Sequence, residues 1–138
     1  DEDLNNHKGI IANPNCSTSQ LMLVLKPLNE KAKIKRLIVS TYKAVSGAGL
    51  AAINELTENT KAVLNNEKFE NSCFKKPIAF NVIPQIDVFC ENGYTKEEMK
   101  VVNETKKILH LPQDLPISCT AARFPAYNGH SDAVDIEF

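Results

Sequence analysis

The sequence predicts an α+β fold in which helices cover a mixed, largely antiparallel sheet. Two observations predict it: segments with the apolar period of a helix alternate with short segments typical of strands, and each type recurs along the chain. At 138 residues the chain fits one domain with a sizeable core. Neither an internal repeat nor a low-complexity tract is found, so we expect neither a solenoid nor a long linker.

Three helices are expected, over residues 16–31, 49–65 and 95–110. In the first, apolar residues recur at i, i+3, i+4 and i+7 from Leu21, and Pro27 inside the pattern predicts a kink. The third begins with a capping box, in which Thr95 is followed three residues later by Glu98. These apolar periods indicate helices that each bury one face.

Three strands are expected, over residues 37–42, 117–124 and 132–138. The first is short and rich in β-branched residues, and the last alternates apolar and acidic side chains. Residues 66–77 are polar and predict a surface loop. Residues 78–89 carry two short apolar runs around Pro84, and we expect extended structure there.

The composition narrows the class of protein. A formal net charge of -1 argues against a general nucleic-acid or membrane surface. The one basic cluster, residues 31–36, is typical of a solvated helix end. The chain has neither a signal-like start nor an apolar run long enough to cross a bilayer, which predicts a soluble, cytoplasmic protein.

Four cysteines occur without a CxxC pair and without histidines at metal spacing, so we expect no metal site and four thiols in a reducing compartment. Free cysteine is among the most buried residue types, and Cys73, Cys90 and Cys119 are interpreted in this way; Cys90 and Cys119 lie in apolar segments and resemble small core residues. Cys16 differs, because it stands between loop-forming residues 13–15 and the first helix. A helix N-terminus offers positive potential and unpaired N–H groups, which favour the nucleophilic thiolate.

The last predicted strand ends in the middle of its alternation, without a turn or cap after Phe138. A half-buried strand normally leads into a turn and a partner strand. We therefore expect the chain to be a piece of a longer protein.

Four motifs resemble those of the aspartate-semialdehyde dehydrogenases, in the same order and at similar spacing. They are Asn-Pro-Asn-Cys-Ser-Thr at 13–18, Val-Ser-Thr-Tyr-Lys-Ala-Val-Ser-Gly-Ala-Gly at 39–49, the helix within 94–109, and Arg-Phe-Pro at 123–125 with His-Ser at 130–131. The resemblance implies that residues 1–138 are a single catalytic and dimerisation domain of a two-domain enzyme. The family's N-terminal dinucleotide-binding domain, with its Gly-rich turn, and its closing C-terminal helix have no counterpart here.

The resemblance also implies an activity. It is the NADPH-dependent reductive dephosphorylation of β-aspartyl phosphate to aspartate semialdehyde, in lysine, threonine and methionine biosynthesis. The reaction passes through a thioester on a cysteine, the NADP cofactor is bound mainly by the missing domain, and the enzyme is a homodimer. The expected fold is that of the catalytic domain of glyceraldehyde-3-phosphate-dehydrogenase-like enzymes.

Residue roles follow from the same resemblance. Cys16 matches the nucleophile and His130 the acid/base histidine, a role suited to an imidazole that titrates near neutrality. Lys43 stands where the family usually carries a glutamine that orients the thiohemiacetal, so either hydride transfer is altered or a cation beside Cys16 assists the thiol. The other matches are Arg123 for the substrate α-carboxylate, Glu97 for its ammonium group, Lys100 and Asn15 for phosphate, and Ser46 and Gly47 for the nicotinamide.

Other interpretations remain. From spacing alone, Glu97 and Lys100 indicate an ordinary i, i+3 surface ion pair. A cysteine acyltransferase or hydrolase that needs no nucleotide would use Cys16 and His130 but leave Arg123 unexplained. A non-catalytic dimerisation module is favoured modestly by Lys43. The related N-acetylglutamyl-phosphate reductases are disfavoured by the residues that flank the cysteine.

Overall fold

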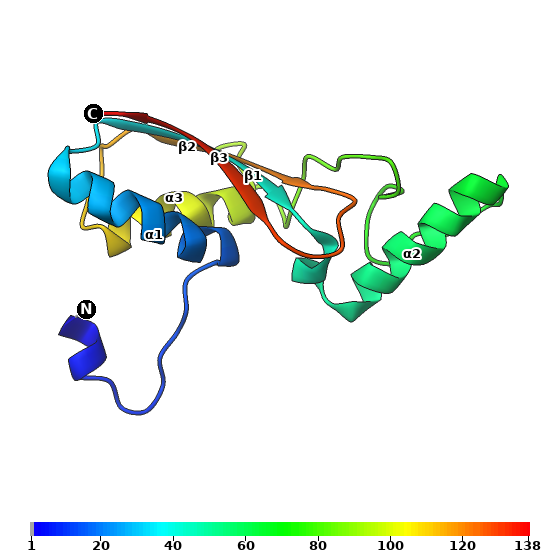
Figure 1. Cartoon of the computed structure of the whole chain (residues 1–138), viewed down its shortest axis with the longest axis horizontal. Helices are drawn as coiled ribbons and strands as arrows, with labels where there is room; N and C mark the ends of the chain where they lie inside the picture. Colours follow the sequence, from blue (N-terminus) through cyan, green and yellow to red (C-terminus); the bar gives the residue numbers. More distant parts are fainter. Residues whose placement is uncertain (1) are drawn as a thin grey trace.

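The computed structural model describes residues 2–138, apart from the side chains of the first two of them. Figure 1 shows an elongated molecule with a sheet and two helices at one end and a third helix projecting at the other. The elements are η1 (Glu2–Asn5), α1 (Cys16–Lys31), β1 (Arg36–Lys43), η2 (Val45–Ala48), α2 (Leu50–Asn65), α3 (Lys96–Ile108), β2 (Ile117–Arg123) and β3 (Ser131–Glu137).

The sheet has the strand order β2-β1-β3. β1 pairs in parallel with β2, with Leu37 opposite Ile117, and antiparallel with β3, with Arg36 opposite Glu137. The mixed sheet expected from the sequence is confirmed, with one ladder of each kind. β1 is the central strand, so residues at its C-terminal end, near Lys43, can contact residues at the ends of both β2 and β3.

Helices α1 and α3 cover one face of the sheet (Figure 1). β1 alternates strictly, so that Leu37, Val39 and Thr41 are buried beneath the helices while Ile38 and Tyr42 remain exposed on the other face. The core of this sheet region consists of Leu21, Leu25, Ile34, Leu37, Val39, Val101, Val102, Leu111, Leu115 and Cys119. The predicted capping box begins α3, where Glu98 accepts from the backbone N–H of Thr95.

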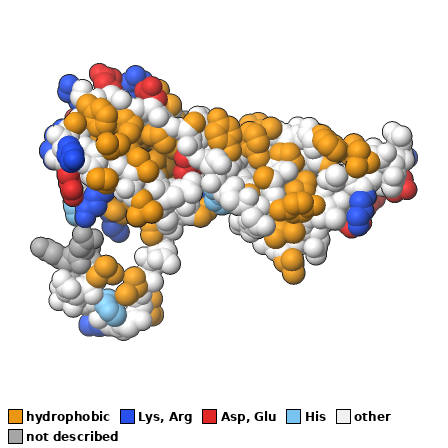
Figure 2. Space-filling model, in the orientation of Figure 1, with side chains coloured by type: hydrophobic (Ala, Val, Ile, Leu, Met, Phe, Trp, Pro, Cys, Tyr) orange, Lys and Arg blue, Asp and Glu red, His pale blue; other side chains and the backbone are white. Residues whose placement is uncertain are grey.

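A second part of the molecule, which we call the arm, consists of η2, α2 and residues 66–90. It has a small cluster of its own, made of Val45, Ala52, Leu56, Ile78, Ala79 and Ile83. In Figure 2 hydrophobic side chains are visible over both the sheet region and the arm. Within residues 2–138, no helix is long and apolar enough to cross a membrane.

The expectation of extended structure over 78–89 is wrong for most of that segment. Only single bridges form, from Ile83 to Arg123 and from Phe89 to Thr95. Phe80 and Asp87 adopt left-handed backbone, with φ of 55° and 67°, and Pro84 has no N–H to donate. These features interrupt any continuous ladder.

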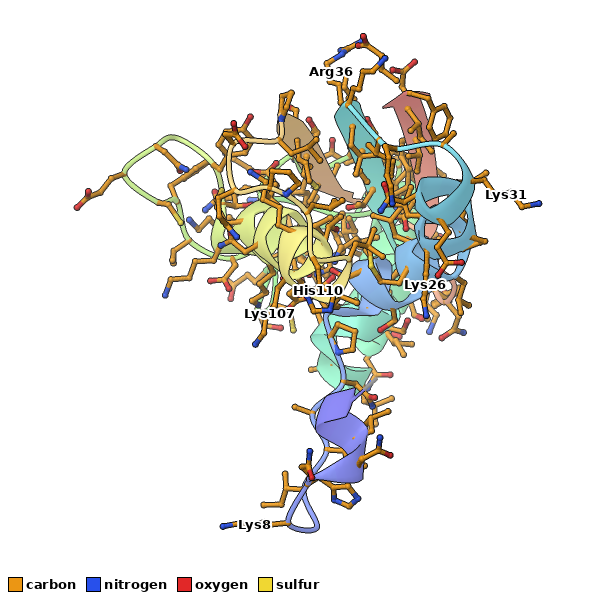
Figure 3. The ribbon with its side chains drawn as sticks, turned by 90° about the vertical axis from the view of Figure 1, so that its left-hand side faces the viewer. Lys8, Lys26, Lys31, Arg36, Lys107 and His110 are labelled. Atoms are coloured by element: carbon orange, nitrogen blue, oxygen red, sulfur yellow. The ribbon has the colours of Figure 1, made fainter. Side chains whose placement is uncertain are left out.

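Two other expectations fare differently. α1 runs without interruption from Cys16 to Lys31 although it contains Pro27. The basic cluster does lie at a helix end: Lys31 is in the last turn of α1, and Arg36 follows at the start of β1 (Figure 3). Arg36 also pairs with Glu137 on β3.

The cysteines are all free. Cys119 is a core residue as expected, and burial raises the pKa of its thiol to about 12, which makes it unreactive at neutral pH. The same expectation is wrong for the other two. Cys90 lies at intermediate exposure in a turn closed by bonds to Gly93 and Tyr94, and Cys73 is exposed.

Candidate functional site

Cys16 is the first residue of α1 and is exposed. Asn15 caps the helix: its side-chain oxygen accepts from the backbone N–H of Ser17 at 3.0 Å. The cap fixes where the chain turns into the helix and leaves the sulfur at its positive end. This is the placement predicted from the sequence.

Lys43, the last residue of β1, lies directly beside Cys16. Its Nζ donates to Cys16 Sγ at 3.7 Å and to Asn15 Oδ1 at 3.2 Å, and it forms an ion pair with Glu97. The side chain is only 1% exposed. The C-terminal end of β1 therefore places the buried ammonium group of Lys43 beside the first residue of α1.

Glu97, in the first turn of α3, joins three of the predicted residues. Its Oε1 accepts from Lys43 and from Asn15 Nδ2, the latter at 2.7 Å, and its Oε2 accepts from Lys100 at 3.1 Å. Burial opposes ionisation of this carboxyl group, but the hydrogen bonds from Lys43 and Asn15 and the charge of Lys43 outweigh it and lower its pKa to about 2. Glu97 is thus a carboxylate throughout the neutral range.

His130 and Arg123 approach the same end of β1 from the other strands. His130 Nδ1 accepts from the backbone N–H of Ala44 at 3.0 Å, and Arg123 Nη1 donates to the carbonyl of Ala44 at 2.7 Å. Gly47 lies against both: a Cβ there would be 3.1 Å from His130 Nε2 and 3.2 Å from Arg123 Nη1. A side chain at position 47 would therefore displace one of them.

The surroundings of His130 keep its ring neutral. Burial, then the positive charges of Lys43 and Arg123, lower its pKa, while Asp132 and Glu97 oppose them. Because Nδ1 accepts a hydrogen bond, the proton of the neutral ring is on Nε2. This nitrogen is therefore a donor, suited to an oxygen that gains negative charge.

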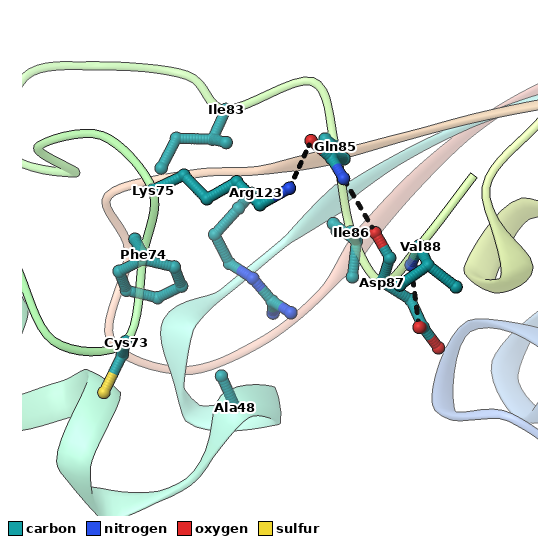
Figure 4. A pocket seen from close by; sticks show the side chains of 10 residues that line it. All are labelled: Ala48, Cys73, Phe74, Lys75, Ile83, Gln85, Ile86, Asp87, Val88 and Arg123. Atoms are coloured by element: carbon teal, nitrogen blue, oxygen red, sulfur yellow. Dashed lines mark hydrogen bonds between the residues drawn. The ribbon is translucent and has the colours of Figure 1, made fainter.

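A cavity of about 350 Å³ lies beyond Arg123, between β2 and the arm. Figure 4 shows the guanidinium group directed toward it. Burial lowers the pKa of Arg123 and the charges of Glu97 and Cys16 act in the opposite direction. The cavity is lined by Ala48, Cys73, Phe74, Lys75, Ile83, Gln85, Ile86, Asp87, Val88 and Arg123.

The predicted site residues thus form two groups joined through the end of β1. One contains Asn15, Cys16, Lys43, Glu97 and Lys100, and the other contains Gly47, Arg123 and His130. Ser46 adjoins the second group as the neighbour of Gly47 in the chain, and its backbone N–H donates to the carbonyl of Tyr127. Among residues 4–138, whose side chains the structure describes, no three His, Cys, Asp or Glu side chains are placed to hold a metal ion.

The sequence interpretation missed Glu104. Its carboxylate accepts a hydrogen bond from the backbone N–H of Asn15 at 2.7 Å and so fixes the position of the residue that caps α1. Glu104 lies seven residues after Glu97, on the same face of α3, and this spacing was a usable signal. The backbone of Ala44 was also missed, because backbone groups leave no trace in a sequence.

Residues 25–138 match the family model described as semialdehyde dehydrogenase, dimerisation domain. Among curated proteins, the aspartate-semialdehyde dehydrogenase of Bacillus subtilis is 53% identical over 98% of this chain, and that of Aquifex aeolicus 51% over 94%. The matches cover 41% and 38% of those proteins, so the chain spans about two fifths of their length.

Solved structures agree with this result. The chain is similar to the aspartate semialdehyde dehydrogenase II of Vibrio cholerae complexed with ASA, with a TM-score of 0.92, 48% identity and coverage of 99% of this chain and 40% of that one. A more distant neighbour is the enzyme of Candida albicans with NADP, at a TM-score of 0.62, 27% identity and coverage of 94% and 30%.

Proposed function

The chain belongs to the aspartate-semialdehyde dehydrogenase family, and from that premise we propose that residues 1–138 are the catalytic and dimerisation domain of an NADPH-dependent enzyme that converts β-aspartyl phosphate to aspartate semialdehyde. The observation that carries the proposal is the meeting, at one end of β1, of an exposed cysteine at a helix N-terminus with the Lys43, Glu97 and Lys100 cluster. His130 and Arg123 border the same strand end.

Cys16 is the proposed nucleophile. Its thiolate attacks the acyl carbon of β-aspartyl phosphate, a C–S bond forms, the C–O bond to phosphate breaks, and a thioester remains on the enzyme. His130 donates a hydrogen bond from Nε2 to the carbonyl oxygen as negative charge develops there. Once the thioester carbon has received a hydride, the oxyanion of the resulting thiohemiacetal would re-form the C=O bond as the C–S bond breaks, which releases aspartate semialdehyde and restores the thiolate.

The substrate groups match charges in the cluster. Arg123 presents a planar fork of donors for the α-carboxylate, and Lys100, 48% exposed in its side chain, is accessible to phosphate. Asn15 stands between the helix start and Glu97, where its amide can assist phosphate binding. Glu97 is proposed to attract the substrate ammonium group.

NADPH supplies the hydride that reduces the thioester carbon. The backbone at Ser46 and Gly47 fits a flat ring, because position 47 is exposed and has no side chain between the backbone and His130. Most of the nucleotide would be bound by the part of the protein outside this chain. The exposed sheet face with Ile38 and Tyr42 is the proposed contact for a second copy in a homodimer.

The test uses the full-length protein that contains this domain, assayed with aspartate semialdehyde, phosphate and NADP for NADPH formation. Cys16→Ser should abolish the reaction, and the matched variant Cys90→Ser should leave it unchanged, because Cys90 lies in the turn closed by Gly93 and Tyr94 and lines neither the cluster nor the cavity. Turnover without nucleotide would instead support a cysteine acyltransferase. Absence of turnover in a folded dimer would support a dimerisation module.

A further inference from the structure

We propose that Lys43 is the fixed counter-ion of the Cys16 thiolate, and that Glu97 and Asn15 are positioning residues that hold its ammonium group against the sulfur. The inference deepens the proposed function and rests on it for the role of Cys16 as nucleophile. It also gives a purpose to the residue at which this chain departs from the family's usual glutamine.

The hydrogen bonds of Lys43 fix the direction of its charge. An ammonium group has three N–H donors, and Lys43 Nζ has three acceptors: Cys16 Sγ, Asn15 Oδ1 and Glu97 Oε1. With 1% of the side chain exposed, water does not compete for these positions. One N–H is therefore directed at the sulfur by the other two bonds.

The ion pair with Glu97 does not draw Lys43 away from the sulfur. Glu97 is shared between Lys43 and Lys100, and Lys100 also pairs with Asp87 at 3.6 Å. The two ammonium groups are thus matched by two carboxylates, and it is the position of Lys43 that brings positive charge to Cys16. Of these two lysines, Lys43 contacts the nucleophile, with its Nζ 3.7 Å from Cys16 Sγ. A glutamine at position 43 would supply a donor to the sulfur without this charge.

His130 is not suited to the same task. A cationic imidazole needs a proton on both nitrogens, and Nδ1 already accepts from the backbone N–H of Ala44. Protonating Nδ1 would break that bond and place a third positive charge near Lys43 and Arg123. The neutral ring is left to donate from Nε2, and the cation that stabilises the thiolate is Lys43.

The experiment compares two alkylating agents of similar size on the full-length protein. Iodoacetate is an anion and iodoacetamide is neutral, so a cation beside a thiolate raises the rate with iodoacetate relative to that with iodoacetamide. Peptide mapping follows each cysteine separately. Cys73 is exposed, and its sulfur lies within hydrogen-bonding distance of the Ser72 hydroxyl, so it serves as the reference thiol in the same molecule.

In the unmodified protein we expect the iodoacetate preference to be about fivefold or more higher at Cys16 than at Cys73, the size of a unit-charge contact at this distance in water. Lys43→Gln should reduce that preference to the value at Cys73. Lys31→Gln removes the same charge at the exposed far end of α1 and should leave it unchanged. Asn15→Ala removes one of the two bonds that hold Lys43 Nζ against the sulfur without changing any charge, and should lower the preference in part.

Equal preferences at Cys16 and Cys73 in the unmodified protein would overturn the proposal, and this comparison needs no variant to fold. An unchanged preference in folded Lys43→Gln would overturn it as well, as would a loss of the preference in His130→Gln equal to that in Lys43→Gln. These readouts do not depend on turnover. A protein without dehydrogenase activity that still shows the Lys43-dependent preference would refute the proposed function and keep this inference.

Discussion

The sheet region and the arm are stabilised in different ways. In the sheet region, large aliphatic side chains from two helices pack on one face of β1 and its neighbours. The arm has a smaller cluster that includes two alanines, and a buried carboxylate and a buried amide fix its loops. Glu55 on α2 accepts from Ser72, Cys73 and Phe74, and Asn59 accepts from the backbone N–H of Ala79.

This difference shows where apolar patterns are sufficient to specify structure. In the sheet region burial follows the period of each element, so packing alone determines the arrangement. In the arm, the backbone of residues 72–79 is irregular, and its N–H groups need acceptors from a neighbouring helix. Those acceptors are two isolated polar side chains, Glu55 and Asn59, and no repeating sequence pattern identifies them.

The largest expected effect comes from breaking the sheet region. Leu25→Ala removes a side chain with no exposed surface from the main cluster and should lower the free energy of unfolding by about 3 kcal/mol. Leu23→Ala, on the exposed side of the same helix at 80% exposure, should change it by less than about 0.5 kcal/mol. Denaturant unfolding measures both, and equal effects would contradict the assignment of the core.

A second variant breaks the arm without touching the sheet. Glu55→Ala leaves the backbone N–H groups of residues 72–74 without their acceptor and should destabilise the loop by about 2 kcal/mol. Hydrogen exchange should accelerate at those amides while β1 stays protected. Glu58→Ala, one turn along α2 and bonded only to exposed Lys61, is the matched control. Equal acceleration in both would exclude Glu55 as the anchor.

The smallest expected effect is a difference in acid sensitivity. The folded pKa of Glu97 is about 2 against an ordinary 4.5, so its stabilisation is present above about pH 4.5 and lost as pH falls toward 2. After allowance for partial solvent screening this amounts to about 1–2 kcal/mol. Glu97→Gln should flatten unfolding free energy against pH in this window. An unchanged profile would mean that the ion pairs of Glu97 contribute nothing to stability.

Most of the fold was predictable from the sequence. α1, β1 and β2 match their expected bounds within one residue at each end, because apolar period and β-branched runs directly encode one-sided burial. Residues 78–89 were not predictable in this way. Left-handed backbone at Phe80 and Asp87 breaks the segment, which is held instead by a bridge from Ile83 to Arg123 and a hydrogen bond from Ala79 to Asn59.

The sequence predicted which residues belong to the candidate site, but not which hydrogen bonds join them. Motif resemblance identified Cys16, Lys43 and Glu97, and the roles given to them remain proposals. That Lys43 binds Glu97 and Asn15 together follows from the position of β1 beneath both α1 and α3, which no local pattern reports. The same is true of Ala44, whose backbone bonds both His130 and Arg123.

The central place of β1 also sets the order in which the protein can assemble. Ala44 is separated from Arg123 by 79 residues and from His130 by 86, and Arg36 from Glu137 by 101. Contacts of such long range close late and slow the folding of a domain. During synthesis the thiol at the start of α1 leaves the ribosome long before the strands that complete its surroundings. A nascent chain therefore carries this cysteine before both the arginine and the histidine that border the end of β1 are in place.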